Sequence, residues 1–384
     1  MKKIYYIAVV FAILFLAGCG DGIDLPGVNV ETDLNKIPLP DNNVNLEQVE
    51  LKPSTEPMLH EGLHTEEDFQ RIRDKKAAGE EPWVSAYQLL VESQFSQKTA
   101  DTYPTEWIKR GVSGDENYMN AARGATIAYQ QALRWKIEQD DEYAAKAVEN
   151  LNKWVQTCVG VTGNTNLSLA AGLYGYEFAI AGELLRDYEG WDRADFAAFQ
   201  NWLLKVFYPA NDDFLKRHHD TNALHYWANW CLCNIAAKMA IGIVTDRRDI
   251  YNEGIGHLQT GDTNGRLRRA IYHDYAPDYN FAQWQESGRD QGHTLMCVGL
   301  MGVICQLAWS QGDDFFAYDD NLFMRACEYA ACCNYTNETV PYTTYIWQKQ
   351  SQWGYPIPEE QTTLGGGKWI KRAIWALPYY HYKG

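Results

Sequence analysis

The chain has 384 residues, of which 46% are hydrophobic and 14% aromatic, and its formal net charge at pH 7 is −16. This acidic balance argues against nucleic acid as a partner, because phosphate backbones are bound by basic surfaces. The apolar and aromatic content excludes a disordered chain and suits carbohydrate binding, although aromatic rings also fill protein cores.

The N-terminus predicts export. Lys2 and Lys3 precede an apolar run over residues 4–16, which ends in Leu16-Ala17-Gly18-Cys19. A basic start, a short apolar run and small residues are typical of a secretory signal, and the run is too short for a transmembrane helix. The last four residues resemble the bacterial lipoprotein processing box, which implies lipidation of Cys19; the alternative is an ordinary signal peptide with an incidental cysteine.

We therefore expect three parts: a lipoprotein signal peptide over 1–18, a lipidated cysteine with a polar tether over 19–60, and one domain over 61–384. The polar tether has the composition of a linker. The expected location is the periplasm or the outer membrane, with the membrane contacted only through the lipid on Cys19.

From residue 61 onward, the sequence predicts successive helices. Thr65 precedes an acid three residues on, which is a helix-start signature, and Asp140 precedes another start. Apolar residues keep helical spacing over 119–137, 167–187, 196–207, 222–243, 290–310 and 320–333. Strand signals are few, the best being 339–347. We expect an all-α fold, an incomplete or closed α/α toroid of about six to seven antiparallel helix hairpins.

A first polar cluster lies near the start of the predicted helix 222–243. Asn222 and His225 are three residues apart, and Asn222 and Tyr226 are four apart, so the three project from one side of a helix. An amide, an imidazole and a phenol suit carboxylate binding and proton transfer. The structural alternative is helix capping with a hydrogen-bonded core histidine. His218, His219 and Asp220 lack the spacing of a metal motif, so we predict neither a metal nor another cofactor.

A second cluster lies in the predicted loop over 272–280, which contains several tyrosines, Tyr275 and Tyr279 among them. A tyrosine beside fixed cations loses its proton more easily, because positive charge favours the phenolate. Packing of aromatic rings in a loop is the alternative.

The stretch 286–293, Glu-Ser-Gly-Arg-Asp-Gln-Gly-His, is the most informative one. It places two acids, a fixed cation, an amide and an imidazole in an apolar, helix-forming region. On a helix, Glu286, Arg289, Asp290 and His293 share a face. A buried helix does not tolerate this assortment without partners, so the stretch predicts a site.

These motifs resemble those of the alginate lyase-like polysaccharide lyases, which are α/α toroids. The similarity extends over about residues 60–375 and rests mainly on Asn222 with His225-Tyr226-Trp227 and on the 286–293 stretch. It implies cleavage of a uronic-acid glycan, such as alginate or glucuronan, by β-elimination. Asn222 and Arg289, with His293, would neutralise the uronate carboxylate, and His225 would act as base or carboxylate ligand.

The resemblance leaves the proton-transfer tyrosine open, because His293 stands where some members have a tyrosine after the arginine. Tyr279 is our choice, with Tyr275 and Tyr226 as alternatives. The remaining residues expected at the substrate are Tyr226, Trp227, Tyr275, Glu286 and Gln291, of which Glu286 and Gln291 would orient Arg289 and His293.

The expected enzyme is a monomer whose partner is a polyanionic uronate polysaccharide. Two alternatives stay open. One is a non-catalytic glycan-binding lipoprotein of a polysaccharide-uptake system. The other is an α/α-toroid glycoside hydrolase, which needs two carboxylates, for which Glu286, Asp290, Asp274 and Asp278 are available.

Overall fold

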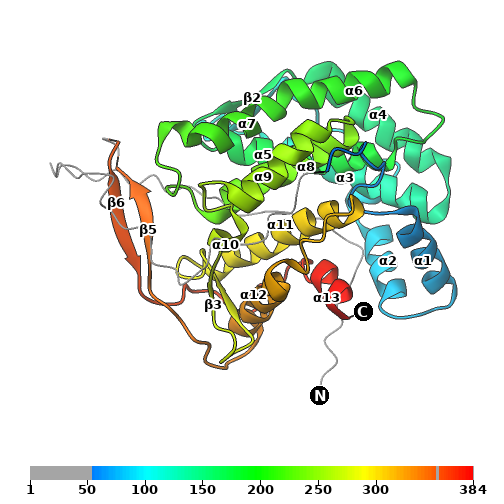
Figure 1. Cartoon of the computed structure of the whole chain (residues 1–384). Coiled ribbons are helices and arrows are strands. Elements are labelled where there is room, and N and C mark those ends of the chain that lie inside the picture. Colours follow the sequence, from blue (N-terminus) through cyan, green and yellow to red (C-terminus); the bar gives the residue numbers. More distant parts are fainter. Residues whose placement is uncertain (1–53, 352–353, 384) are drawn as a thin grey trace.

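The computed structural model describes residues 54–351 and 354–383 (Figure 1). The predicted signal peptide, Cys19 and most of the predicted tether lie outside the described residues. Four helices form an inner layer: α3 (Tyr118–Glu138), α5 (Leu167–Leu184), α8 (Ala228–Val244) and α11 (Gln291–Ser310). Each packs against the next in this order, so together they form an arc.

Three of the inner helices, α5, α8 and α11, are apolar on nearly every side, whereas α3 also carries charged and polar residues. All residues of α8 are buried, as are all residues of α5 except Leu167. A helix that is hydrophobic all round is stable only inside a core. By length and composition α11 could cross a membrane, yet 78% of its apolar window is buried inside the molecule, as in a core helix.

An outer layer covers the arc. It comprises α4 (Asp141–Thr157), α6 (Arg193–Val206), α7 (Tyr208–Arg217), α9 (Arg248–Thr260) and α12 (Tyr318–Tyr335). These helices are amphipathic: in α4 the buried residues recur at helical spacing, and the charged ones face outward. The pairs α3–α4, α8–α9 and α11–α12 are inner–outer hairpins in contact.

Three further helices close the space between α11 and α3. They are α1 (Glu66–Ala77), α2 (Trp83–Glu92) and α13 (Ala376–Lys383). α13 packs on α11, and the ring of Tyr380 lies 5.9 Å from that of Trp83 on α2. Figure 1 shows these helices together at one end of the molecule. The predicted helical toroid is thus confirmed.

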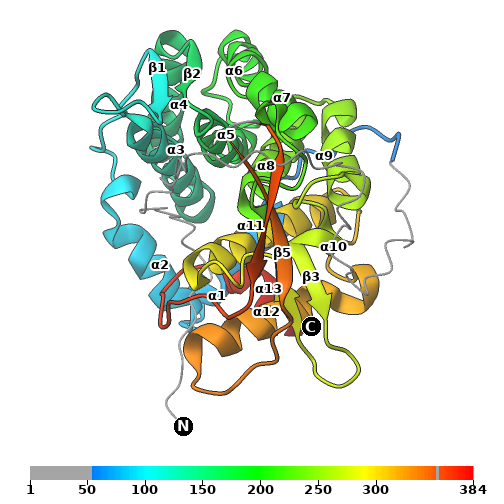
Figure 2. The ribbon, with the colours of Figure 1, turned by 90° about the vertical axis from the view of Figure 1, so that its left-hand side faces the viewer.

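Short strands form three two-stranded sheets at one end of the toroid. β1 (Trp107–Arg110) pairs in parallel with β2 (Gly160–Gly163), β3 (Ile271–Asp274) pairs antiparallel with β4 (Ala282–Trp284), and β5 (Tyr345–Gln350) pairs antiparallel with β6 (Pro356–Gln361). In Figure 2 the β5–β6 hairpin crosses in front of the starts of α8 and α11. The predicted strand 339–347 therefore exists, but it begins and ends later.

Several helix starts agree with the sequence. Thr65 and Asp68 form a reciprocal capping box at α1, and the Asp140 side chain caps α4. Two expectations were wrong. The helix expected over 222–243 begins only at Ala228, and the residues before Gln291 form a turn, with Asp290 as the N-cap of α11.

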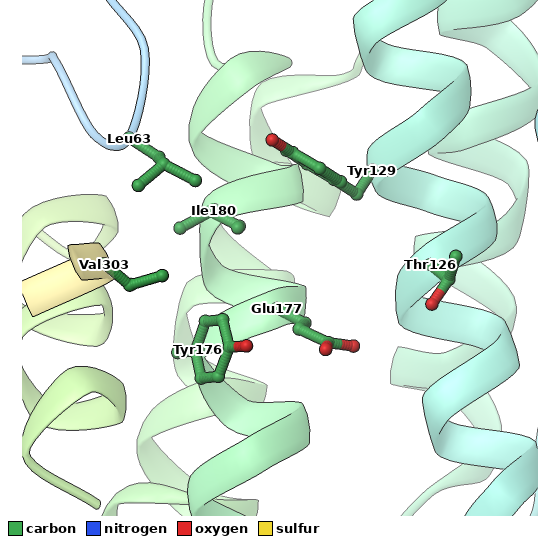
Figure 3. Close-up of a pocket in the computed structure, with 7 residues that line it drawn as sticks. All are labelled: Leu63, Thr126, Tyr129, Tyr176, Glu177, Ile180 and Val303. Carbon is green, nitrogen blue, oxygen red and sulfur yellow. The ribbon is translucent and has the colours of Figure 1, made fainter. Parts of the chain in front are cut away.

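The core contains a small cavity between α3 and α5 (Figure 3). The Glu177 carboxylate and the Tyr176 hydroxyl point into the same space, across from Thr126. Glu177 Oε2 and the Tyr176 hydroxyl are buried without a hydrogen-bond partner, and burial raises the pKa of Glu177 well above its usual value. The cavity holds little more than one water molecule, so it is no site for a polysaccharide. All eight described cysteines are buried and free.

Candidate active site

The inner helices α5, α8 and α11 begin at one end of the toroid, and this end carries the predicted site residues. Ser168 Oγ in the first turn of α5 lies 2.9 Å from Nε2 of His219, which precedes α8. The Glu286 carboxylate, which precedes α11, accepts the Asn229 N–H of α8 at 3.0 Å. The β5–β6 hairpin lies across these starts (Figure 2). We refer to this end of the toroid as the mouth.

Asn222 lies in an irregular segment before α8 and contacts the hairpin. Its Oδ1 accepts the Leu224 N–H at 3.0 Å, a local turn that explains why the helix does not begin here. Its Nδ2 donates to the Gln348 carbonyl and to Gln350 Oε1, both at 3.2 Å. Asn222 and His225 are therefore brought together by the hairpin rather than by helical spacing.

His225 is half-buried, and its ring is fixed by the same strand. Its Nδ1 accepts the Gln350 N–H at 2.8 Å, and its carbonyl accepts the Trp347 Nε1–H at 2.7 Å. Because Nδ1 is an acceptor, the neutral ring carries its proton on Nε2. Burial, helped by the charge of Lys349, lowers the pKa of His225 to about 4. At neutral pH this imidazole is an uncharged N–H donor.

Aromatic stacking connects His225 to Arg289. The Trp347 ring stacks on His225 at 6.1 Å and on Trp227 at 4.4 Å between ring centroids. The Arg289 guanidinium carbon lies 5.3 Å from the centre of the Trp227 ring. Trp227 is itself buried, so it supports Arg289 as a platform, by a cation–π contact, rather than as an exposed sugar-stacking ring.

Glu286, expected at the substrate, is fully buried and joins the two predicted segments. Oε1 accepts the Asn229 N–H at 3.0 Å and also the Asn229 side-chain amide, while Oε2 lies 3.4 Å from Arg289 Nη1. A carboxylate at a helix N-terminus satisfies free N–H groups and the helix dipole. Glu286 thus caps α8 and holds Arg289; the expected orienting role agrees with this geometry, whereas direct substrate contact does not.

Asp290 and His293 form a second pair at the start of α11. Asp290 Oδ1 accepts the His293 N–H at 2.8 Å, and Oδ2 lies 2.5 Å from His293 Nδ1. A carboxylate only accepts, so Nδ1 carries a proton, and when the ring is neutral its lone pair is on Nε2. Burial alone would raise the pKa of Asp290, but the His293 bonds and charge, with Arg289, hold it below its usual value. Both side chains are partly exposed.

Two other predicted substrate residues are buried. Gln291 is 1% exposed, and its N–H donates to the Gly366 carbonyl at 2.9 Å, so it anchors the segment after the hairpin. Tyr226 is 7% exposed and packs between Phe214 and Trp230. Both side chains have protein partners, neighbouring rings for Tyr226 and the Gly365 carbonyl at 3.3 Å for Gln291, and these partners do not agree with direct substrate contact.

Of the three predicted tyrosines, Tyr226 contacts His225, with ring centroids 4.8 Å apart, whereas Tyr279 and Tyr275 lie elsewhere. Tyr279 lies at the tip of the β3–β4 hairpin, where its side chain is 54% exposed, and the tip points away from the start of α8 (Figure 2). The Tyr275 hydroxyl donates to Gln283 Oε1 at 2.5 Å and lies 3.1 Å from Thr343 Oγ1. Tyr279 was chosen because it follows His225 by 54 residues, but it lies in the loop between β3 and β4.

Sequence reasoning missed the contribution of the β5–β6 hairpin and the role of Asp290. Trp347 and Gln350 lie more than 120 residues after His225, so no local pattern connects them. The Asp290–His293 pair was readable from its spacing of three residues. In the described part of the chain, no group of three or more His, Cys, Asp or Glu side chains is placed to hold a metal ion.

Comparison with known proteins identifies the family and supports the fold. The alginate lyase family model matches residues 72–338. The structure is similar to that of alginate lyase A1-III from Sphingomonas species A1, with 13% identity, a TM-score of 0.50, and coverage of 72% of this chain and 79% of that one. It is also similar to an alginate lyase from Bacteroides ovatus, with 15% identity, a TM-score of 0.51, and coverage of 71% and 82%. No curated protein matches the chain.

Proposed function

The chain belongs to the alginate lyase family, and from this premise we propose that it cleaves a polyuronate, such as alginate or glucuronan, by β-elimination. The family and the shared fold support a polysaccharide lyase. The single observation that carries the finer proposal is the mouth itself. At the mouth, Arg289 is connected to two histidines. The Trp347 and Trp227 rings connect it to His225, and the Asp290 carboxylate connects it to His293.

The reaction requires three things of the site: stabilisation of the uronate carboxylate, removal of the C5 proton, and delivery of a proton to the leaving oxygen. The C5–H bond of a uronate breaks, its electron pair forms the C4–C5 double bond, and the C4–O bond breaks with a proton delivered to the leaving oxygen. Charge develops on the carboxylate before the leaving group departs. Donors or cations placed at that carboxylate therefore lower the barrier most.

Arg289 suits the carboxylate task. Its side chain is 20% exposed, its guanidinium lies on the Trp227 ring, and Glu286 contacts it from the buried side. A planar guanidinium binds a carboxylate through two parallel N–H bonds. Asn222 and His225 would add neutral N–H donors, because the His225 proton lies on Nε2. A neutral imidazole gives up its proton poorly, so we assign His225 to carboxylate binding rather than to proton transfer.

His293 suits the proton transfer. With Nδ1–H donated to Asp290, Nε2 has the lone pair that a general base requires. The Asp290 carboxylate orients the ring and stabilises the imidazolium once the C5 proton has moved. The same imidazolium can then give the proton to the leaving glycosidic oxygen, so no tyrosine is needed.

A polyuronate panel tests the proposal. Incubation without added metal should raise the near-ultraviolet absorbance, since each cleavage creates an unsaturated product end. We expect His293→Ala to lower kcat by about 100- to 10,000-fold. His60→Ala is the matched control, because His60 is exposed and pairs with Asp246 beyond the far end of α8.

The other outcomes are equally informative. No absorbance change on any polyuronate contradicts the proposal. Glycan binding without turnover, unaffected by His225→Ala, would indicate a binding lipoprotein. Saturated reducing sugars, together with loss of activity in Glu286→Gln, would indicate a glycoside hydrolase.

We also propose that the protein is exported and anchored by a lipid on Cys19, in the periplasm or the outer membrane. This rests on the residues of the N-terminal segment alone. Labelling of the expressed chain with a radioactive fatty acid, lost in Cys19→Ala, is the expected result. Equal labelling of both chains would contradict it.

A further inference from the structure

Arg110 is a buried cation that forms no ion pair with any described residue. Its side chain is 8% exposed, and Nη1 is buried without a hydrogen-bond partner. Among the described residues, no carboxylate lies within 4.0 Å of its guanidinium. In a chain with 50 acidic residues, such an omission is notable, because an unpaired buried charge destabilises the fold.

The strand that carries Arg110 directs it inward. In β1 the residues alternate, with Ile108 and Arg110 buried, and with Trp107 exposed and Lys109 partly so. Lys109 pairs with Asp115 at 2.6 Å, so the cation on the outer side is neutralised. The cation on the inner side is not.

The Arg110 guanidinium lies against an aromatic ring. Its central carbon lies 4.6 Å from the centre of the Tyr118 ring, and this ring stacks on Tyr174 at 6.4 Å. Burial raises the pKa of Tyr174, and the Arg110 charge partly offsets that rise, which places the cation near the phenol. A cation on aromatic rings, with N–H groups unused, is the composition of a site for an anionic ligand.

Arg110 belongs to the mouth. β1 leads into α3 and its partner β2 leads into α5, so Arg110 lies where these two inner helices begin. The α5 start is joined to the pre-α8 segment through Ser168 and His219. Since α3, α5, α8 and α11 follow one another in the arc, Arg110 and Arg289 stand at its two ends.

We propose that Arg110 forms a second carboxylate subsite, which binds a uronate unit of the same polysaccharide some distance from the unit held by Arg289. This rests on the proposed function. A polyuronate carries one carboxylate on every sugar, so a chain lying across the mouth presents acids to both ends of the arc. Tyr118 and Tyr174 line the subsite.

The melting temperature of an Arg110 variant distinguishes a binding role of this residue from a structural one. Arg110→Met removes the charge and keeps most of the volume. If Arg110 is kept for a ligand, the unliganded variant should melt at the same temperature or higher, because an uncompensated charge is gone. Arg247→Met is the control, since Arg247 is half-exposed, pairs with Asp249, and lies at the other end of α8. A lower melting temperature or failure to fold in Arg110→Met, with Arg110→Lys stable, would overturn the inference.

Binding provides the second readout. Calorimetry with hexasaccharides of mannuronate, guluronate and glucuronate should show Arg110→Met weakening the best of them about tenfold to a hundredfold. The carboxyl-reduced neutral hexasaccharide should bind both proteins equally. In turnover, KM should rise with kcat little changed, because the subsite is remote from the reacting bond.

The outcomes distinguish the two proposals. Turnover by the wild type with an unchanged Arg110→Met affinity would overturn the subsite and leave the lyase. Binding that depends on Arg110, without turnover, would leave the subsite and overturn the lyase. Absence of both binding and turnover for all three hexasaccharides would overturn both.

Discussion

Replacement of Glu286 tests the role that the structure gives to the most polar stretch of the chain. Its carboxylate is fully buried, accepts two N–H groups of Asn229, and lies 3.4 Å from Arg289 Nη1. Glu286→Gln keeps an oxygen for Asn229 and removes the charge. Glu286→Leu removes the acceptors and leaves the Arg289 cation without its buried counter-ion.

The magnitudes follow from these contacts. Glu286→Leu should lower the free energy of unfolding by about 3–5 kcal/mol, the usual effect of breaking a buried ion pair from one side. Glu286→Gln loses one charge-assisted hydrogen bond and the favourable charge at the start of α8, about 2 kcal/mol. Because Arg289 loses its support in both variants, kcat/KM should fall about tenfold or more in each, with unsaturated products still formed.

Urea unfolding at pH 7 and absorbance-based turnover of a polyuronate give the two readouts. Glu66→Gln is a matched control, because Glu66 is exposed on α1 and its ion pair with Arg73 contributes little. If Glu286→Gln were as stable as the wild type yet had no activity at all, Glu286 would be a chemical participant. The capping role argued from its burial would then be refuted.

Three further predictions concern single contacts. Lys349→Gln should raise the pKa of His225 from about 4 toward its usual value, as followed by NMR titration, because one of its two depressing causes is removed; an unchanged pKa would contradict this. Glu177 has a raised pKa, so its folded form keeps a proton that the unfolded chain releases, and stability should fall as pH rises above about 4.5. Glu177→Gln should abolish that fall in urea unfolding series, whereas a parallel fall in the variant would assign it to other groups. Trp347→Ala should speed proteolysis within 345–361 about tenfold, since two ring contacts and one hydrogen bond hold the hairpin; equal cleavage of both proteins would contradict this.

Features that depend on neighbouring residues were predictable from the sequence. Thr65 with Asp68, and Asp140, mark helix starts because capping is settled within four residues. The buried inner helices were recognisable because their apolar residues fill every side. The toroid was expected from the succession of helices in antiparallel pairs and from the family resemblance.

Features that depend on distant residues were not predictable. The helix expected from Asn222 begins at Ala228 because Gln285 accepts the Ala228 N–H at 3.0 Å, and Glu286 accepts the next one. Both acceptors come from a segment nearly 60 residues later. The spacing argument for Asn222 and His225 therefore reached a correct neighbourhood for a wrong reason, since β5 rather than a helix brings the two side chains together.

The identity of the proton-transfer group depends on both kinds of feature. The search for a tyrosine followed the sequence spacing, yet the Tyr275 hydroxyl is engaged by Gln283, and the Tyr345 hydroxyl donates to the Gln285 carbonyl. The histidines differ instead in which nitrogen is occupied. Asp290, three residues before His293, accepts the Nδ1–H and leaves the lone pair of the neutral ring on Nε2. A strand N–H 125 residues away instead donates to the Nδ1 lone pair of His225 and leaves an N–H on Nε2. The partner of Nδ1 therefore gives the two histidines opposite roles at Nε2. Of these two partners, only Asp290 is close to its histidine in the sequence.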